Sequence, residues 1–163
     1  AERLDIPVGI HMGYGAPGGP YWIYPAYRAS LGNPLLLEDL LARHPKLRMY
    51  VMHAGMPMTD EMIAVLYSHP QVYVDIAADN VSVPRAEFYV HLRRLVEAGY
   101  GKRVMFGSDQ MIWPEAIKVA VESITDAPFL SAEQKRDILY NNAARFLRLS
   151  QETIDQHHGL NDR

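Results

Sequence analysis

Short apolar runs, each followed by a helical pattern, are the feature that most restricts how this chain can fold. The runs are nearly continuous, which is typical of strands buried on both faces of a sheet. They cover residues 6–10, 49–52, 72–76 and 104–106. Strands that alternate with helices in this way predict a parallel sheet whose strands are joined by right-handed crossovers.

The helical segments between these runs carry recognisable start signals. One helix is predicted over 34–43, because Asn33 is a good cap and Pro34 suits the first turn. We expect its leucines to share one buried face, and they are Leu36, Leu37, Leu40 and Leu41. Further helices are predicted from about 59, from 84 to about 97, and after the capping box at 131–134.

Two architectures fit this alternation, an open doubly wound sheet and a closed barrel. A weak repeat, in which 42–53 parallels 67–75, indicates that the unit is one strand with one helix. A (β/α)8 TIM barrel takes about 250 residues, so four such units in 163 residues fit half of one. We therefore predict an α/β fold, half of a TIM barrel over 1–150, with a polar C-terminal tail over 151–163. Because the chain starts with Ala1 close to the first strand, we expect the native polypeptide to extend upstream.

Composition excludes several kinds of partner. The net charge is −3, so no basic field is available to hold nucleic acid or an anionic membrane surface. No apolar run approaches the roughly 18 residues of a membrane span. There are no cysteines, so any metal ligands must be histidines and carboxylates. The expected partner is a small molecule.

Three of the predicted strands run into a residue that can bind a metal. These residues are His11, His53 and Asp109. In parallel α/β architectures the active site lies at the carboxyl ends of the strands. Two imidazoles and a carboxylate suit one divalent ion, Zn first, with Mn or Fe as alternatives. Because Zn prefers about four ligands, further ligands would have to come from a missing strand or from water.

Each of these residues also has a structural interpretation. A histidine at a strand end is often a turn residue that bonds a backbone carbonyl, which would account for His11 and His53. Asp109 could be the N-cap of the following helix.

The other histidines are expected to be structural or solvated. His44 and His69 precede prolines at predicted helix C-termini, where a cation complements the helix dipole. We expect His91 to be solvated on a helix, and His157 and His158 to be solvated in the tail.

Taken together, the motifs resemble those of the amidohydrolase-related (amidohydrolase 2) family. The matching segments are His11-Met-Gly, His53-Ala-Gly, Phe106-Gly-Ser-Asp109 and the run 141–147, Asn-Asn-Ala-Ala-Arg-Phe-Leu. The resemblance extends to about Ser150 and corresponds to barrel strands five to eight. The His-x-His or Glu-x-His pair of strand one is not in this chain.

The resemblance implies an enzyme and a role for each residue. His11 would be the strand-five metal ligand, and Asp109 would be the strand-eight acid that binds metal and acts as general base. His53 would bind the substrate and donate a hydrogen bond to its carbonyl oxygen as negative charge develops. Metal-activated water would then hydrolyse an amide, ester or lactone.

Two alternatives to hydrolysis remain open. The family also includes decarboxylases, so the same site could cleave a carboxyl group from a hydroxy- or amino-substituted unsaturated or aromatic acid. A non-catalytic module that binds a small molecule is the second alternative.

An aromatic and glycine-rich segment, 13–27, follows the first strand. It lacks the Lys-Ser/Thr of a P-loop and the spacing of a dinucleotide turn. We interpret it as a lid that brings Tyr14 and Trp22 to a substrate pocket; the alternative is a loop that packs across the barrel mouth. Asp75, Asp79 and Asn80 follow the third strand and could also face the site. Asp79 and, after Asp109, Trp113 complete the predicted substrate-binding set.

A half barrel leaves two strand edges and an apolar interior uncovered. We therefore expect the chain to form a homo-oligomer or to pair with the missing N-terminal half.

Overall fold

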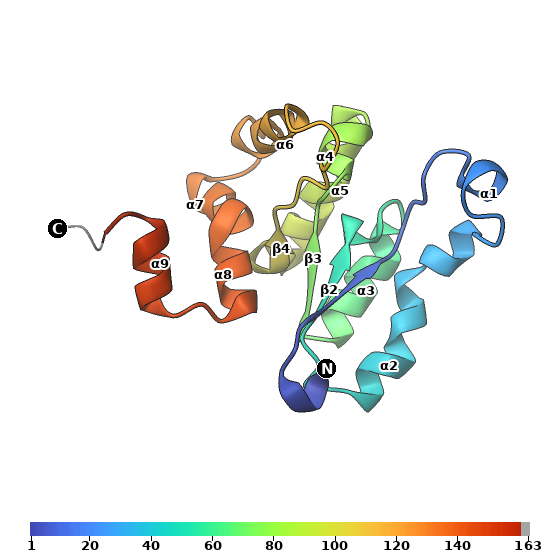
Figure 1. Cartoon of the computed structure of the whole chain (residues 1–163), viewed down its shortest axis with the longest axis horizontal. Coiled ribbons are helices and arrows are strands. Elements are labelled where there is room, and N and C mark those ends of the chain that lie inside the picture. The colour runs from blue at the N-terminus through green and yellow to red at the C-terminus, as the bar shows by residue number, and fades with distance from the viewer. Residues whose placement is uncertain (161–163) are drawn as a thin grey trace.

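A four-stranded parallel sheet forms the centre of the computed structural model, which describes residues 1–160. Its strands are β1 (Val8–His11), β2 (Met49–Met52), β3 (Val72–Asp75) and β4 (Val104–Met105). They lie side by side in chain order (Figure 1). This order has no reversal, whereas a doubly wound sheet has a point at which the order reverses. The strand order therefore agrees with the prediction of part of a barrel and differs from that of a doubly wound sheet.

Helices connect the strands as the sequence predicts, and most of them are short. They are α1 (Gly19–Trp22), α2 (Glu38–Arg43), α3 (Thr59–Ser68), α4 (Asp79–Ser82), α5 (Arg85–Leu95), α6 (Ala116–Thr125), α7 (Ala132–Arg136), α8 (Asn142–Leu147) and α9 (Gln151–His157). Single turns of 3₁₀ helix cover Glu2–Leu4, Ala29–Gly32, Pro34–Leu37, His53–Gly55 and Gly101–Arg103, and π turns cover Val96–Tyr100 and Asp137–Asn141. Within residues 1–160 no helix is long and apolar enough to cross a membrane.

The two faces of the sheet differ in what covers them. Alternate strand side chains such as Val51 and Val74 are fully buried and belong to the core that includes residues of α2, α3 and α5, among them Phe88. The register pairs Tyr50 with Tyr73, and His11 and Asp75 occupy the same face as these tyrosines, because strand side chains alternate. In a closed barrel this second face would be the interior.

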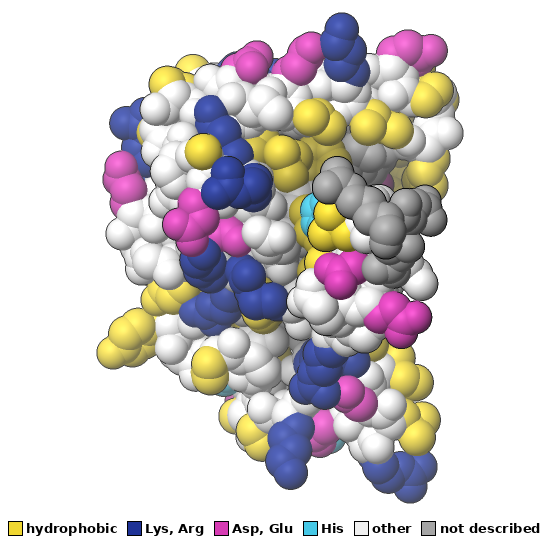
Figure 2. All heavy atoms as spheres, turned by 90° about the vertical axis from the view of Figure 1, so that its left-hand side faces the viewer, with side chains coloured by type: hydrophobic (Ala, Val, Ile, Leu, Met, Phe, Trp, Pro, Cys, Tyr) yellow, Lys and Arg dark blue, Asp and Glu magenta, His cyan; other side chains and the backbone are white. Residues whose placement is uncertain are grey.

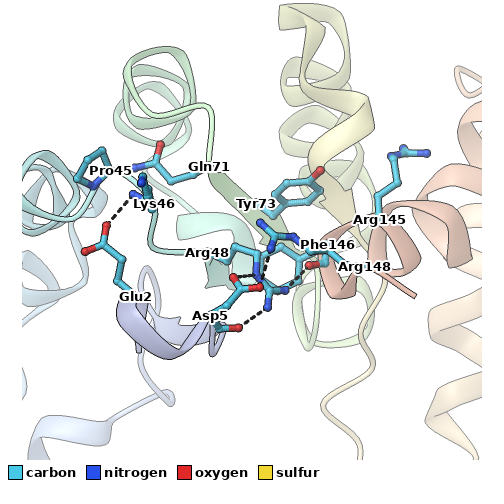
Figure 3. Close-up of a pocket in the computed structure, with 10 residues that line it drawn as sticks. All are labelled: Glu2, Asp5, Pro45, Lys46, Arg48, Gln71, Tyr73, Arg145, Phe146 and Arg148. Carbon is cyan, nitrogen blue, oxygen red and sulfur yellow. Dashed lines mark hydrogen bonds and ion pairs between the residues drawn. The ribbon is translucent and has the colours of Figure 1, made fainter. Parts of the chain in front are cut away.

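The amino ends of the strands are held by an arginine cluster around Asp5 (Figure 3). Arg48 Nε donates to Asp5 Oδ1 (2.9 Å), and Arg148 Nη1 donates to Asp5 Oδ2 (2.6 Å). Arg48 Nη1 also donates to the carbonyl oxygen of Phe146 (2.7 Å). These residues line a cavity of about 540 Å³. The cavity lies at the end of the sheet opposite the predicted site, and two of its arginines are already paired, so we assign it to the scaffold.

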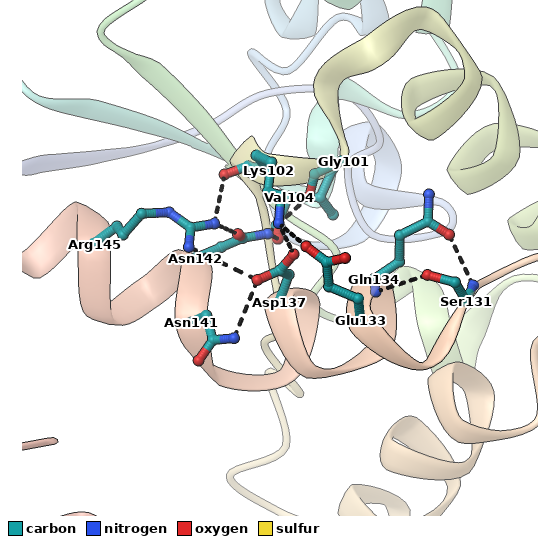
Figure 4. Close-up of polar contacts among 10 residues, drawn as sticks. All are labelled: Gly101, Lys102, Val104, Ser131, Glu133, Gln134, Asp137, Asn141, Asn142 and Arg145. Carbon is teal, nitrogen blue, oxygen red and sulfur yellow. Dashed lines mark hydrogen bonds and ion pairs between the residues drawn. The ribbon is translucent and has the colours of Figure 1, made fainter. Parts of the chain in front are cut away.

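The run 141–147, part of the family resemblance, anchors α8 to β4 (Figure 4). Asn142 is fully buried, and its Nδ2 donates to the carbonyl oxygens of Gly101 (2.8 Å) and Val104 (2.5 Å). Arg145 donates to Asn142 Oδ1 and holds that amide in place. The asparagine therefore ties α8 to the turn before β4 and to the first residue of β4.

A buried carboxylate next to this anchor strengthens it. Lys102 Nζ donates to Asp137 Oδ2 (2.5 Å), and Asn141 Nδ2 donates to Asp137 Oδ1 (3.1 Å). Burial alone would raise the pKa of Asp137, but these hydrogen bonds outweigh burial and hold that pKa below its usual range. Asp137 therefore remains ionised and paired.

Charged side chains form no continuous field on the face that carries α7, α8 and α9 (Figure 2). Basic side chains there are interspersed with acidic and apolar ones. This distribution agrees with the small net charge of −3.

One helix prediction needs correction. The segment predicted as one helix over 34–43 begins as a 3₁₀ turn and becomes α2 only at Glu38. Leu37 and Leu41 are buried, but Leu36 is 60% exposed, so the prediction of one shared buried face was wrong. A 3₁₀ turn has three residues per turn rather than 3.6, which rotates Leu36 away from the core. The helix predicted from 84 to about 97 is confirmed: α5 runs to Leu95 and continues into the π turn Val96–Tyr100.

His91 is the clearest error among the histidines, because it is buried rather than solvated. Its side chain is 3% exposed, and Nδ1 lies 2.7 Å from Thr59 Oγ1. Burial, with a smaller contribution from Arg94, lowers its pKa to about 4. The ring is therefore neutral at pH 7 and joins α3 to α5.

The remaining histidines lie where the sequence places them. His44 and His69 are the C-caps of α2 and α3. His157 and His158 are exposed. The polar tail predicted over 151–163 contains α9, which Ser150 caps, and its last residues, 161–163, lie outside the described part of the chain.

Candidate functional site

Polar side chains gather at the carboxyl ends of the strands. His11 is the last residue of β1, His53 follows β2 directly, and Asp75 is the last residue of β3. The rings of His11 and His53 are 4.5 Å apart between centroids and lie edge to face, with an interplanar angle of 63°. Parallel strands thus bring together two imidazoles that are 42 residues apart in the sequence.

The ring of His53 is held in one orientation. Its side chain is only 8% exposed, and Nδ1 lies 2.8 Å from the carbonyl oxygen of Ala77. A carbonyl can only accept, so Nδ1 carries the proton and the neutral ring presents Nε2 as an acceptor. The donor role predicted for His53 would therefore require the imidazolium form.

The ring of His11 is held from the other side. Nε2 lies 2.7 Å from the carbonyl oxygen of Tyr14, so Nε2 donates and Nδ1 keeps its lone pair. A backbone carbonyl that accepts from one imidazole nitrogen is the usual way to orient a histidine whose other nitrogen binds a metal.

Residues other than glycine adopt positive φ angles after three of the four strands. The φ angles are 60° at His53, 58° at Ala78 and 54° at Asp109. For residues other than glycine this region costs about 1–2 kcal/mol each. Strain of this kind persists only where the surroundings hold it in place, and it concentrates at functional sites. Here the strained residues cluster at the same end of the sheet as His11.

Asp109 lies in the loop after β4 and is exposed, whereas Asp75 is 8% exposed. Burial raises the pKa of Asp75, hydrogen bonds from the N–H groups of His53 and Ala77 lower it, and the charge of Asp109 raises it further. The net direction is upward. Asp75 ends β3 and Asp109 follows β4, so both carboxyls lie at the same end of the sheet.

The donor groups fit part of a metal site. Nδ1 of His11 and the carboxylate of Asp109 are ligand types that Zn, Mn and Fe accept. Residues 1–160 contain no group of three or more His, Cys, Asp or Glu side chains placed to hold a metal ion. Because a zinc site takes about four ligands, His11 and Asp109 would supply only part of such a set.

Asp79, one of the predicted substrate-binding residues, is a buried acid with a free oxygen. It is 4% exposed, and its Oδ2 has no hydrogen-bond partner among the described residues. Burial, followed by the charge of Asp75, raises its pKa from 3.8 to about 8. Asp79 is therefore largely protonated at pH 7 and can donate a hydrogen bond.

The aromatic residues predicted to contact substrate are all at the surface. Exposure is 45% for Tyr14, 86% for Trp22 and 65% for Trp113. Trp22 ends α1, in the loop after β1, and Trp113 lies in the loop after β4 (Figure 1). The structure thus places these aromatics on loops after the two outer strands, and their contact with substrate stays a prediction.

The groups that the sequence analysis missed are backbone carbonyls. Those of Tyr14 and Ala77 orient the two imidazoles. Residue type carries no signal for a backbone acceptor, so only the β1–α1 and β3–α4 turns themselves could reveal them. The carboxylate of Asp75 was noted for its position, but its bonds to the backbone were not foreseen.

Replacing Asp79 with Asn is expected to stabilise the protein increasingly as pH rises. The folded-state pKa of about 8 lies above the ordinary value of 3.8, so between these values the unfolded chain is ionised while the folded chain holds a proton. The wild type therefore loses stability relative to Asp79→Asn from about pH 4 to about pH 8, and the difference levels off above that. Urea denaturation across this range measures it, and a difference that does not change with pH would contradict the assignment.

Comparison with known proteins identifies the class to which this fold and site belong. Residues 1–149 match the Amidohydrolase family profile, and the chain belongs to that family. It is 24% identical to protein fluG of Emericella nidulans over 135 residues, which is 74% of this chain and 16% of fluG.

Solved structures show the same fold. An uncharacterized TIM-barrel protein from Bordetella bronchiseptica is 22% identical, with a TM-score of 0.67 over 90% of this chain and 47% of that one. A probable 2-pyrone-4,6-dicarboxylic acid hydrolase from Acinetobacter baumannii is 13% identical, with a TM-score of 0.64 over 91% of this chain and 54% of that one. 5-Carboxyvanillate decarboxylase from Sphingomonas paucimobilis is 19% identical, with a TM-score of 0.61 over 91% of this chain and 51% of that one.

The chain thus spans about half the length of these structures, and its fold is that of part of a TIM barrel. Its assignment to strands five to eight stays a prediction.

Proposed function

We propose that this chain is part of a metal-dependent hydrolase that acts on an amide, ester or lactone of a small molecule. The observation that carries the proposal is the pair of edge-to-face imidazoles at the strand ends, each oriented by a backbone carbonyl. Membership of the Amidohydrolase family supports an enzyme.

His11 and Asp109 would supply two ligands to one divalent ion, with zinc first and manganese or iron as alternatives, and the rest of the barrel would supply the others. Such an ion, when bound, lowers the pKa of a bound water and polarises a carbonyl group. Asp109 is exposed at the strand ends and would take a proton from the attacking water and return it to the leaving group.

The other site residues would recognise the substrate. His53, when protonated, would donate from Nε2 to the substrate carbonyl oxygen as negative charge develops there. Asp79, as a neutral acid, would donate a second hydrogen bond. Tyr14, Trp22 and Trp113 would cover an apolar part of the substrate, since exposed aromatics on site loops suit that role.

A decarboxylase is the main alternative, and specific similarities favour keeping it. Besides 5-carboxyvanillate decarboxylase, 2,6-dihydroxybenzoate decarboxylase has the same fold, with a TM-score of 0.60. In this reaction the site would grip a hydroxy-acid and deliver a proton to carbon. A non-catalytic small-molecule module is a further candidate.

A substrate panel on the full-length protein separates these functions. The panel contains a pyrone lactone, aryl esters and amides, and hydroxybenzoic acids, assayed with added Zn²⁺ or Mn²⁺ and after chelation. Ring opening, ester or amide cleavage that chelation abolishes supports the hydrolase. Loss of carboxylate as CO₂ supports the decarboxylase, and binding without turnover of any compound would leave the non-catalytic module.

We also propose that the outer strand β1 pairs with the rest of a barrel or with a second copy. The predicted second free edge, that of β4, is already bonded, because the carbonyl oxygen of Val104 accepts from Asn142 and the N–H of Phe106 donates to Ile138. β1 is an outer strand of the sheet, and exposed strand edges tend to acquire partners. Sedimentation of residues 1–160 alone tests this: self-association is expected, and a stable monomer that unfolds cooperatively would contradict it.

A further inference from the structure

We infer that Asp75 is a positioning residue for His53. The catalytic importance of His53 rests on the proposed function, but the positioning itself does not. Asp75 ends β3 and lies 8% exposed, next to the turn that carries His53. Neither the sequence pattern nor the family match assigns it this role.

One carboxylate oxygen of Asp75 positions both the backbone and the ring of His53. Asp75 Oδ1 accepts from the backbone N–H of His53 (3.0 Å) and from the backbone N–H of Ala77 (3.0 Å). The carbonyl of the same Ala77 accepts from His53 Nδ1 (2.8 Å). Asp75 therefore fixes the main chain of His53 directly and its ring through Ala77.

The backbone around His53 needs such support. Three consecutive residues adopt left-handed conformations, with φ of 60° at His53, 46° at Ala54 and 66° at Gly55. His53 and Ala54 have side chains that disfavour this region. Asp75 Oδ1, on the neighbouring strand, accepts from the first residue of this turn, so Asp75 offsets the strain at the point where β2 turns into the site.

The ring tautomer follows from this geometry. While Ala77 is held in place, its carbonyl oxygen can accept only from a protonated Nδ1 of His53, which leaves Nε2 of the neutral ring as the acceptor. The backbone N–H of Asp79 also donates to this carbonyl (2.7 Å), so the β3–α4 turn is braced from both sides. Without Asp75, Ala77 and its carbonyl would lose their fixed position, and the ring could populate both tautomers.

Long-range proton–nitrogen NMR of the full-length protein, labelled with ¹⁵N-histidine, tests the inference without any substrate. The spectra are taken at a pH at which the rings are neutral, and the His53 signals are identified by their loss in His53→Gln. We expect a single Nδ1–H tautomer of His53 in the wild type. Asp75→Ala is expected to give averaged nitrogen shifts, which indicate mixed tautomers.

Two variants make the result specific. Asp75→Asn keeps an acceptor oxygen and is expected to retain the wild-type tautomer, whereas Asp126→Ala, at the exposed end of α6, controls for loss of a carboxylate elsewhere. A single Nδ1–H tautomer in folded Asp75→Ala would overturn the inference. If Asp75→Ala does not fold, Asp75→Leu replaces it, because leucine keeps much of the side-chain volume but has no acceptor oxygen; a single Nδ1–H tautomer in folded Asp75→Leu would equally overturn the inference.

Kinetics provide a second arm once a turned-over substrate is known. A positioning role predicts that Asp75→Ala lowers kcat about 10–100-fold with little change in KM, and that Asp75→Asn recovers most of the loss. Wild-type protein that turns over no compound would contradict the proposed function, while the tautomer measurement would still decide the role of Asp75.

Discussion

Asp109→Asn is expected to lower kcat about 10²–10⁴-fold in the full-length protein, because it removes a general base. Asparagine keeps the size and the hydrogen-bonding oxygen of the side chain but cannot take a proton. Asp109 is exposed and sits in a left-handed conformation that asparagine also tolerates. The fold should therefore survive, and substrate affinity should change much less than rate.

Steady-state kinetics on the most active compound of the panel measure the effect, and urea denaturation checks the fold. Asp39→Asn is the matched control, since Asp39 is an exposed carboxylate on α2. It should retain wild-type kcat. Full activity in Asp109→Asn would remove Asp109 from the mechanism and the proposed acid–base chemistry with it.

Phe146→Ala is expected to lower the free energy of unfolding by about 3–5 kcal/mol, the usual cost of removing a buried phenylalanine. The ring is 4% exposed on α8 and packs against Tyr50 and Tyr73, with centroid distances of 5.7 and 5.1 Å. The guanidinium of Arg48 lies 5.9 Å from the same centroid. Phe146 thus joins α8 to two strands across the face that the core helices leave uncovered.

Leu147→Ala is the control for this second prediction, because Leu147 is the next residue of the same helix but is 50% exposed. Its replacement should cost well under half as much. Urea unfolding of both variants in the full-length protein gives the comparison. Equal losses for the two residues would show that packing on Tyr50 and Tyr73 does not determine the stability of α8.

The two ends of the sheet differ in how their polar side chains are paired. At the amino ends, Arg48, Arg148 and Asp5 join segments far apart in the chain, and their side chains are bonded to one another or to backbone. At the carboxyl ends, Asp79 has a carboxyl oxygen without a partner within residues 1–160, and His53 is strained. This division between a stabilising end and a reactive end is the one that TIM barrels show.

Much of this organisation could be predicted from local pattern. Strand positions follow from short apolar runs, and all four predicted strands form within two residues of their expected bounds. Helix starts such as the capping box at Ser131 follow from a backbone requirement that the side chain meets locally. The sequence also predicted that His11, His53 and Asp109 lie at one end of the sheet, because the carboxyl ends of parallel strands point the same way.

Only the tertiary structure decided how those residues are presented. The proton on Nδ1 of His53 depends on the carbonyl of Ala77, 24 residues away, and on Asp75 of the next strand. The burial of His91 depends on Thr59 of another helix, and a helical pattern alone cannot show which neighbour will cover a face. Hydrophobic periodicity and capping are properties of consecutive residues, so the sequence by itself determined the strands, their order of appearance and the polar residues at their ends. Tautomer, burial and backbone strain arise where distant segments meet, and they were decided only when the sheet brought those segments together.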